Sequence, residues 1–311
     1  MSVESERARR TALWEQLRTT SPENMTAALL RQLRVYGGAQ GIWVDTQLTS
    51  TVSPEARGIT VSILHTGVHY PDDLSESGLL YHYPDTNRSA GRDRSEIEAT
   101  KAACQLGLPI FVILSEESDD RLRQVRLGWV ADWDDESKQF LVLFGESQPQ
   151  LEPSPSGDQP FKLHDDGGRR TVMTKARLGQ QKFRFQVLKQ YGAKCCVCSI
   201  SVPELLAAAH ICGKEHRGSD DWRNGIPLCH THHSAFDSGF FAVNPSTFGI
   251  EVREGYSTVT LGLTEAILSP LRQYPHPEAL DWRYQKRRIA STESDQPGND
   301  SPNRDSALQS E

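Results

Sequence analysis

Long apolar runs and an excess of positive charge are both missing from this 311-residue sequence. No stretch of about 18 apolar residues occurs, which excludes a conventional membrane-spanning helix. The first residues, MSVESERARR, hold no apolar core of a secretory signal, so we expect a cytoplasmic protein without a membrane partner. The net charge is −7, so any contact with nucleic acid must come from local patches of cations and not from the protein as a whole.

Cysteine is scarce outside one segment. Five of the six cysteines lie between positions 195 and 229, and in a reducing cytosol such crowding favours metal binding over disulfides. Two residues separate Cys195 from Cys198, and two separate Cys229 from His232. Two close pairs of Cys or His joined by a loop suit tetrahedral Zn²⁺. The sequence therefore predicts a structural zinc on these four residues, which would replace the apolar core that a small unit lacks.

Three further polar residues of the same segment have a characteristic order and spacing. His210 follows a run of small residues, Asn224 comes fourteen residues later, and His233 comes nine residues after that. This order resembles the HNH endonuclease motif, also called the ββα-metal fold. The resemblance implies that His210 ends a strand, that Asn224 lies on the second arm of a hairpin, and that His233 faces a metal from a helix. Asn224-Gly225 is also a dipeptide typical of tight turns.

The residue types agree with nuclease chemistry. A neutral imidazole can take a proton from water near neutral pH, so His210 is the predicted general base. One divalent cation, Mg²⁺ or Mn²⁺, on His233 and Asp237 would stabilise charge at the scissile phosphate. Asn224 would fix the hairpin, and with it the tautomer of His210. Many family members carry Asp or His where this chain has Ala209, and we expect Asp237 to replace that ligand. The plainer alternative is a structural zinc knuckle without catalysis.

The N-terminal half has a different pattern. Residues 41–145 combine short apolar strands with one helix, predicted over 96–106, and a helical pair over 4–35 precedes them. This pattern predicts an α+β fold with a curled sheet. Among the strands lies a polar stretch, 66–93, rich in aromatic residues, carboxylates and glycines. Such a loop has no packing rationale, and loops on a rigid scaffold often carry function.

That stretch contains a family pattern. It reads, in order, Tyr70-Pro71-Asp72-Asp73, Gly78, Tyr83-Pro84 and Gly91-Arg92-Asp93. This resembles the SRA (SET- and RING-associated) domain, which binds modified cytosine, and the resemblance covers residues 41–145. It implies that the N-terminal half is an SRA-like curled sheet or barrel with helices, and a reader of modified DNA. Pro84 stands where the family has Thr, which leaves open whether the cytosine carries a 5-methyl, a 5-hydroxymethyl or a glucosylated group.

A flipped cytosine needs two flat faces and an acceptor for its exocyclic amine. Tyr70 and Tyr83 are predicted to sandwich the ring, and Asp73 to accept a hydrogen bond from the N4 amine. The alternative is that the tyrosines are core aromatics and that the two aspartates belong to a turn.

Composition divides the chain into four parts. We predict a reader over 1–148, a linker over 149–168 that is rich in Pro, Ser, Gly and Asp, an HNH nuclease domain over 169–288, and a disordered tail over 289–311. The segment that leads into the nuclease domain carries eight cations and no acid, which favours contact with phosphates. The residues predicted to contact the duplex backbone are Arg177, Gln180 and Arg184.

Together these features predict a two-domain, modification-dependent DNA endonuclease, similar to type IV restriction enzymes. Its partner would be double-stranded DNA that carries a modified cytosine. One active site cuts one strand, so a double-strand break would require a homodimer or two encounters. Two rivals remain open: a reader of modified DNA with a vestigial or nicking HNH unit, and an HNH nuclease gated by a small nucleotide ligand.

Overall fold

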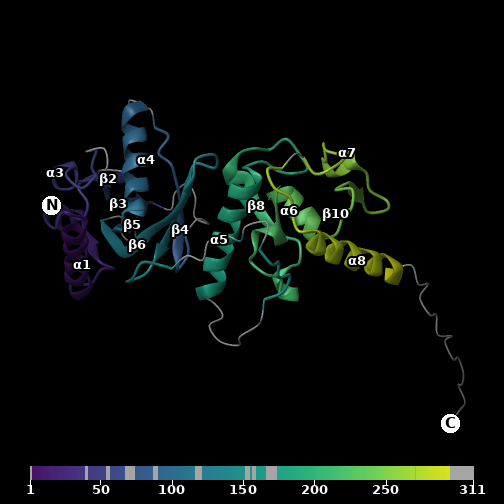
Figure 1. Cartoon of the computed structure of the whole chain (residues 1–311), viewed down its shortest axis with the longest axis horizontal. Coiled ribbons are helices and arrows are strands. Elements are labelled where there is room, and N and C mark those ends of the chain that lie inside the picture. Colours follow the sequence, from purple (N-terminus) through teal and green to yellow (C-terminus); the bar gives the residue numbers. More distant parts are fainter. Residues whose placement is uncertain are drawn as a thin grey trace, which may run out of the picture.

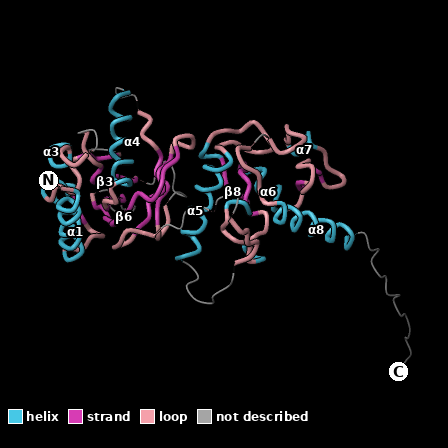
Figure 2. The backbone as a smooth tube through the Cα atoms, in the orientation of Figure 1, coloured by secondary structure: helices cyan, strands magenta, loops and turns pink. Residues whose placement is uncertain are grey.

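The computed structural model describes residues 2–38, 41–53, 57–66, 74–86, 90–115, 121–150, 155, 159–165, 174–269 and 271–294. Figure 1 shows a sheet domain on the left, helix α5 in the middle and a smaller mixed domain on the right. The same orientation in Figure 2 shows that most of the strands belong to the first of these parts. The mixed α+β composition predicted from the sequence is confirmed.

The N-terminal domain is built on one open mixed sheet. Its elements are α1 (Val3–Thr19), β1 (Met25–Thr26), α2 (Ala27–Gln32), β2 (Ile42–Val44), α3 (Thr46–Thr49), β3 (Thr60–His65), β4 (Gly78–His82), α4 (Ala90–Gln105), β5 (Pro109–Ser115), β6 (Leu122–Asp134) and β7 (Gln139–Phe144). The strand order is β2-β3-β5-β6-β7-β4, and β1 pairs with β6. Only β3 and β5 run parallel among the described pairs. No described pairing joins β2 to β4, so the barrel that we expected is not confirmed.

Both faces of the sheet are covered, which explains the unbroken apolar run of β5. Its residues alternate between two cores. Ile110 and Val112 pack with the α4 side of the sheet, whereas Phe111 and Ile113 pack with residues of α1 and α2 such as Leu17. A strand that is buried on both faces has no solvent side on which a polar residue would be favoured.

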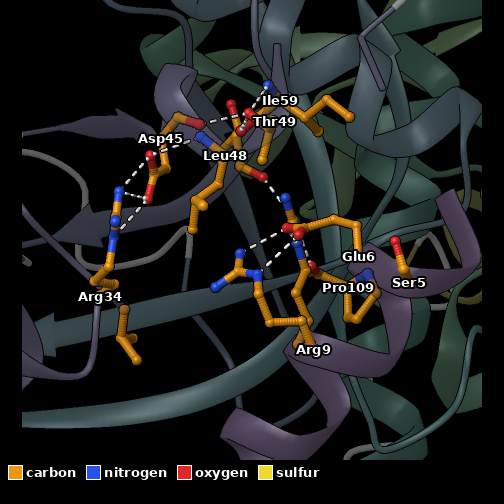
Figure 3. A network of polar contacts seen from close by, with 12 residues as sticks. Ser5, Glu6, Arg9, Arg34, Asp45, Leu48, Thr49, Ile59 and Pro109 are labelled. Carbon is orange, nitrogen blue, oxygen red and sulfur yellow. Dashed lines mark hydrogen bonds and ion pairs between the residues drawn. The ribbon is translucent and has the colours of Figure 1, made fainter. Parts of the chain in front are cut away.

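A buried charge attaches α1 to this sheet. Arg10 is fully buried and donates hydrogen bonds to Glu6, at 2.7 Å, and to the backbone carbonyls of Thr60 and Pro109, at 2.8 and 2.7 Å. Figure 3 shows Glu6, its second partner Arg9 and Pro109 in this network. A buried guanidinium is tolerated only where acceptors replace water. The network therefore holds α1 where β3 and β5 begin.

The C-terminal domain contains a hairpin followed by a helix. Its elements are α5 (Thr174–Tyr191), η2 (Pro203–Leu205), β8 (Leu206–His210), η3 (Lys214–His216), η4 (Trp222–Asn224), β9 (Gly225–Cys229), α6 (His230–Asp237), β10 (Phe241–Val243), β11 (Ile250–Val252), α7 (Thr258–Leu261) and α8 (Pro277–Ser294). β8 pairs with β9 and β10 with β11, both antiparallel. The closing helix α8 continues six residues beyond position 288, into the segment for which we expected disorder.

Helix α5 belongs to both domains. Phe185 is buried against Leu80, Leu141 and Leu143 of the N-terminal sheet. Phe183, two residues earlier, belongs to the core of the C-terminal domain. Polar contacts reinforce the first interface: Gln181 contacts Ser75 at 2.9 Å and Lys189 contacts Asp132 at 2.7 Å. Outside α5, His82 of β4 lies 3.5 Å from Glu204 of η2.

Gly225 serves this packing and not a left-handed turn. Its φ of −134° is extended backbone. A Cβ at this position would lie 2.5 Å from Cζ of Phe183 and 2.7 Å from Cγ2 of Val187. The glycine therefore lets α5 approach β9 closely. The prediction of a tight turn at Asn224-Gly225 was wrong about why a glycine stands at position 225.

The described part of the expected linker is attached to the C-terminal domain. Trp222 donates to the carbonyl of Pro155 at 2.8 Å, and Arg223 donates to the carbonyl of Gln159 at 2.7 Å. Leu163 is buried in the main core of that domain. Backbone carbonyls make most of these contacts, and composition does not show them. Within the described residues, none of the helices combines the length and the apolar character that a membrane crossing requires.

Phe185 allows a direct test of this shared helix. Phe185→Ala should lower the free energy of unfolding by about 3–5 kcal/mol, because it leaves a cavity where α5 meets the sheet. The control Val259→Ala removes methyl groups from a side chain that is 87% exposed, and it should change stability by less than about 0.5 kcal/mol. Urea unfolding of the full chain measures both. An equal, small effect of the two substitutions would contradict the interface.

Candidate metal and nuclease site

The candidate site is built on the β8–β9 hairpin and helix α6. His210 ends β8, and its Cα pairs with that of Gly225 at the start of β9. α6 begins directly after Cys229, the last residue of β9. The hairpin and the helix therefore follow each other without a loop, and His233 lies on a helix as predicted. Asn224 differs slightly from expectation, because it ends the short turn η4 just before β9.

Asn224 closes the loop between the two strands. It is fully buried. Its Oδ1 accepts from the backbone N–H of Cys212 at 2.9 Å, and its Nδ2 donates to the carbonyls of Cys212 and Ser219 at 3.1 and 2.9 Å. The side chain thus satisfies backbone groups that would otherwise be buried without partners. It contacts the loop that follows His210 and not the imidazole itself.

His210 lines a cleft whose other walls include residues of α5, α6 and α8. Its ring stacks on Phe183 of α5, with 3.8 Å between ring centroids and 9° between planes. Its Nε2 lies 3.0 Å from Oδ1 of Asp220. Lys214 also contacts Asp220, at 2.8 Å. Burial alone would raise the pKa of Asp220, but the hydrogen bonds from His210 and Lys214 hold that pKa below its ordinary value.

His233 and Asp237 line the same cleft, which has a volume of about 530 Å³. They lie one turn apart on α6, with Nε2 of His233 3.3 Å from Oδ2 of Asp237. Burial lowers the pKa of His233, although Asp237 opposes the shift, so the imidazole is neutral and able to bind a cation near neutral pH. One nitrogen and one carboxylate suit a divalent ion that keeps several waters. The structure therefore brings the predicted base and the predicted cation ligands into one cleft.

The four predicted zinc ligands meet where β9 ends and α6 begins. The ligand atoms of Cys195, Cys198, Cys229 and His232 all lie within 4.8 Å of one another, and all four residues are buried. Nδ1 of His232 is 3.1 Å from the sulfur of Cys229. Its Nε2 is 3.0 Å from the carbonyl of Leu261. Since that carbonyl can only accept, the proton belongs on Nε2 and the lone pair of Nδ1 points toward the thiols.

The chemistry of this group of four fits a soft cation. Without a cation, burial raises the pKa of Cys195 to about 12, so the thiol would stay protonated. A bound Zn²⁺ would remove that proton and neutralise the charge. Cys196 is also buried but lies outside the group of four.

The predicted base pocket is described only in part. Tyr70 and Asp73 lie outside the described residues. The ring of Tyr83 packs on Phe140 at 4.5 Å, and its hydroxyl donates to Asp135 at 2.9 Å. The hydroxyl of Tyr83 has a raised pKa, because of burial and the neighbouring carboxylate. These contacts match the core-aromatic alternative, and the role of Tyr83 in base binding stays a prediction.

The predicted DNA contacts have mixed surroundings. The side chain of Arg177 lies outside the described residues, and Gln180 lines the cleft. Arg184 also lines it, but donates to the carbonyls of Leu206 and Pro203 at 3.2 and 2.9 Å. Arg184 therefore attaches α5 to the start of β8 whatever its contact with DNA.

Sequence reasoning missed several residues of the cleft. Lys214 and Arg283 line it, and Asp220 contacts its histidine. Arg283 comes from α8 and donates to the carbonyls of Phe236 and Asp237 at the end of α6. A cation near the last carbonyls of a helix is a recognisable stabilising feature. Because Arg283 lies 46 residues after Asp237 in the sequence, no short motif indicated this contact.

The zinc group yields a prediction with a neighbouring control. Purified protein should hold one tightly bound Zn²⁺ per chain, and Cys198→Ala should lose the metal and unfold the C-terminal domain. Cys196→Ala removes an adjacent buried sulfur and should keep the zinc. Metal analysis and circular dichroism on the two variants test this. A folded Cys198→Ala protein, or a folded wild type without zinc, would contradict the assignment.

Comparison with known proteins agrees with this geometry. A family described as HNH endonuclease matches residues 195–244, and no curated protein matches the chain. A solved structure titled modification-dependent TagI restriction endonuclease is 18% identical with a TM-score of 0.33, over 85% of this chain and 92% of that one. Another, the type IV phosphorothioation-dependent restriction endonuclease ScoMcrA, is 12% identical with a TM-score of 0.25, over 86% and 70%. At such low TM-scores neither similarity shows a shared fold. The family match and the hairpin–helix site together make residues 195–244 an HNH endonuclease domain, and the chain a metal-dependent DNA endonuclease.

Proposed function

We propose that this chain hydrolyses a phosphodiester bond of double-stranded DNA close to a modified cytosine. The observation that carries the hydrolytic half is the single cleft shared by His210, His233 and Asp237. A proton acceptor and a pair of cation ligands in one cleft are what metal-assisted hydrolysis requires. Zinc, on Cys195, Cys198, Cys229 and His232, has a structural role in this proposal.

In the proposed reaction, His210 removes a proton from water while the water oxygen attacks phosphorus and the phosphorus–oxygen bond to the leaving group breaks. A cation held by His233 and Asp237 supplies charge stabilisation at the phosphate and the leaving oxygen when it is bound. Phe183 holds the plane of the His210 ring. Asn224 holds the loop behind it, so the base needs little rearrangement at the moment of reaction.

The charge of the cleft supports a phosphate substrate. Lys214, Arg184 and Arg283 lie among its lining residues, opposed by the carboxylates of Glu215 and Asp237. The net charge of −7 for the whole chain makes such local cations the means of attracting DNA. Arg177 and Gln180 of α5 would extend this contact along the duplex backbone.

We assign recognition of the modified base to the N-terminal domain. The support is the SRA-like pattern between residues 66 and 93, in which Tyr70 and Tyr83 would hold a flipped cytosine and Asp73 would accept from its amine. The 5-substituent would be methyl or hydroxymethyl. Residues 1–148 would act as the reader and 169–288 as the nuclease, with Mg²⁺ or Mn²⁺ as the catalytic ion. Cleavage of both strands would use a homodimer.

His210→Ala tests the nuclease half. It should abolish cleavage of modified plasmid in Mg²⁺ or Mn²⁺, because no base remains to accept the proton. Folding and binding of DNA should be unchanged. Gel electrophoresis of the products and a gel shift on the same preparation measure this. Cleavage at the wild-type rate by the variant would remove His210 from the mechanism.

The reader is tested separately. Asp73→Ala should lower the preference for modified over unmodified duplex by about one to two orders of magnitude, since the cytosine amine would lose its acceptor. Tyr70→Ala and Tyr83→Ala should have similar effects, because base stacking contributes about 1–3 kcal/mol. Competition binding with methylated, hydroxymethylated and plain duplexes measures the preference. A wild type that favours no modified cytosine would overturn the reader and leave the nuclease intact. It would also support the ligand-gated rival.

A further inference from the structure

The His210 ring is held by two different restraints. Stacking on Phe183 fixes the plane of the imidazole, since the two rings are nearly parallel at 9°. A half-turn about the Cβ–Cγ bond would keep this plane but exchange the positions of Nδ1 and Cδ2. The stack alone therefore does not decide which ring nitrogen faces the cleft.

Asp220 supplies the missing restraint. Its Oδ1 lies 3.0 Å from Nε2 of His210. The half-turned ring would present a carbon to this oxygen and lose the hydrogen bond. Among the described residues, no hydrogen bond to Nδ1 competes with this arrangement. Nδ1 is thus the nitrogen left to act in the cleft.

The loop that carries Asp220 is itself held in place. The carbonyl of the preceding residue, Ser219, accepts from Asn224 at 2.9 Å, and the Ser219 hydroxyl donates to the carbonyl of Lys162 at 2.6 Å. On the other side, Asp221 forms an ion pair with Arg223 at 2.7 Å. Contacts on both flanks limit the movement of the Asp220 carboxylate, as a group that orients another must be limited.

Lys214 reduces the effect of the Asp220 charge on His210 but leaves the hydrogen bond between the two residues. Its Nζ lies 2.8 Å from the same Oδ1 that contacts His210. The lysine compensates the carboxylate charge, so the field of Asp220 at the imidazole is partly cancelled. What remains is the direction of the acceptor. A directional acceptor on Nε2 fixes the proton there, as an orienting carboxylate does in other histidine-dependent enzymes.

We propose that Asp220 is the positioning residue of this nuclease. It holds His210 in the tautomer with its proton on Nε2 and leaves the lone pair of Nδ1 to accept the proton of the attacking water. The proposal rests on the proposed role of His210 as the general base. It assigns no contact between Asp220 and the DNA.

Two substitutions distinguish orientation from charge. Asp220→Ala removes the acceptor and should lower the single-turnover rate at saturating DNA by about 10- to 100-fold, with an unchanged dissociation constant for DNA. Asp220→Asn keeps an oxygen acceptor for His210. The amide of the variant would turn its oxygen toward Lys214 and His210, because its NH2 group in that position would face the Lys214 ammonium. Asp220→Asn should therefore stay within about threefold of the wild-type rate. An Ala variant at the wild-type rate, or an Asn variant as slow as Ala, would overturn the proposal.

Nitrogen-15 NMR of the His210 ring in the full zinc-loaded chain gives a readout besides activity. Wild type and Asp220→Asn should show one tautomer with the proton on Nε2, and Asp220→Ala should show a mixture. A proton on Nδ1 in wild type would overturn the proposal whatever the rates. Asp165→Asn is the matched control, because Asp165 also pairs with Lys214, at 3.2 Å, but does not contact His210. It should change neither readout.

The two proposals fail in different ways. If His210→Ala cuts DNA normally, the base assignment fails, while the NMR spectra still report whether Asp220 fixes the tautomer. If His210→Ala is inactive and Asp220→Ala is as fast as wild type, the nuclease stands and only the role of Asp220 falls.

Discussion

The rotation of helix α6 about its own axis is the constraint on which the rest of the site depends. Two consecutive residues of this helix face different environments. His232 is buried with its Nδ1 toward the thiols of the predicted zinc ligands, and His233 lines the candidate nuclease cleft. A metal bond to His232 would fix the rotation of α6 about its axis, and this rotation decides where His233 and Asp237 point. Because Cys229 ends β9 and His232 follows in the first turn of α6, the same ion would also fix the angle between hairpin and helix. A metal on these four ligands would thus prepare the cleft for a catalytic ion.

Helix α5 places a second constraint on the chemistry. The aromatic ring that stacks on His210 and the ring that is buried in the N-terminal sheet belong to Phe183 and Phe185, two residues apart on one helix. Movement of one domain relative to the other would have to expose Phe185 or separate Lys189 from Asp132. Both would cost free energy. The N-terminal sheet is therefore connected to His210 through one packed helix and not through a flexible linker. The described residues Phe161 and Leu163 pack on the C-terminal domain. A reader attached in this way would hold the cleft at a set distance from the modified DNA base that it binds.

Site residues could be predicted from the sequence where they lie close to one another along the chain, and not where folding brings distant residues together. Zinc ligands come as pairs with two residues between them, a spacing that the chemistry of the ion imposes on nearby residues, and all four predicted ligands meet. His210, His233 and Asp237 share a cleft for a related reason, because one hairpin and one helix carry them. Asp220 and Arg283 left no such signal, since loop closure and the packing of α8 bring them to the cleft. The expected linker is a further case that composition does not decide. Its described residues Pro155 and Gln159 accept hydrogen bonds at their backbone carbonyls from Trp222 and Arg223.

The residue before the base shows how the described ligands limit the catalytic ion. Where many HNH domains have a ligand, this chain has Ala209, which is fully buried and offers no donor. Asp220 lies next to His210, but its Oδ1 already contacts both His210 and Lys214. A carboxylate paired with a lysine is a poor ligand for a divalent cation. His233 and Asp237 are then the described side chains best placed to hold the ion. A divalent cation with two protein ligands fills its remaining positions with water and with phosphate oxygens. We therefore expect the ion and the DNA to strengthen each other's binding by equal factors, as linkage requires. In such a cleft the substrate completes the metal site, so the ion would be held firmly only when there is a phosphodiester bond to cut.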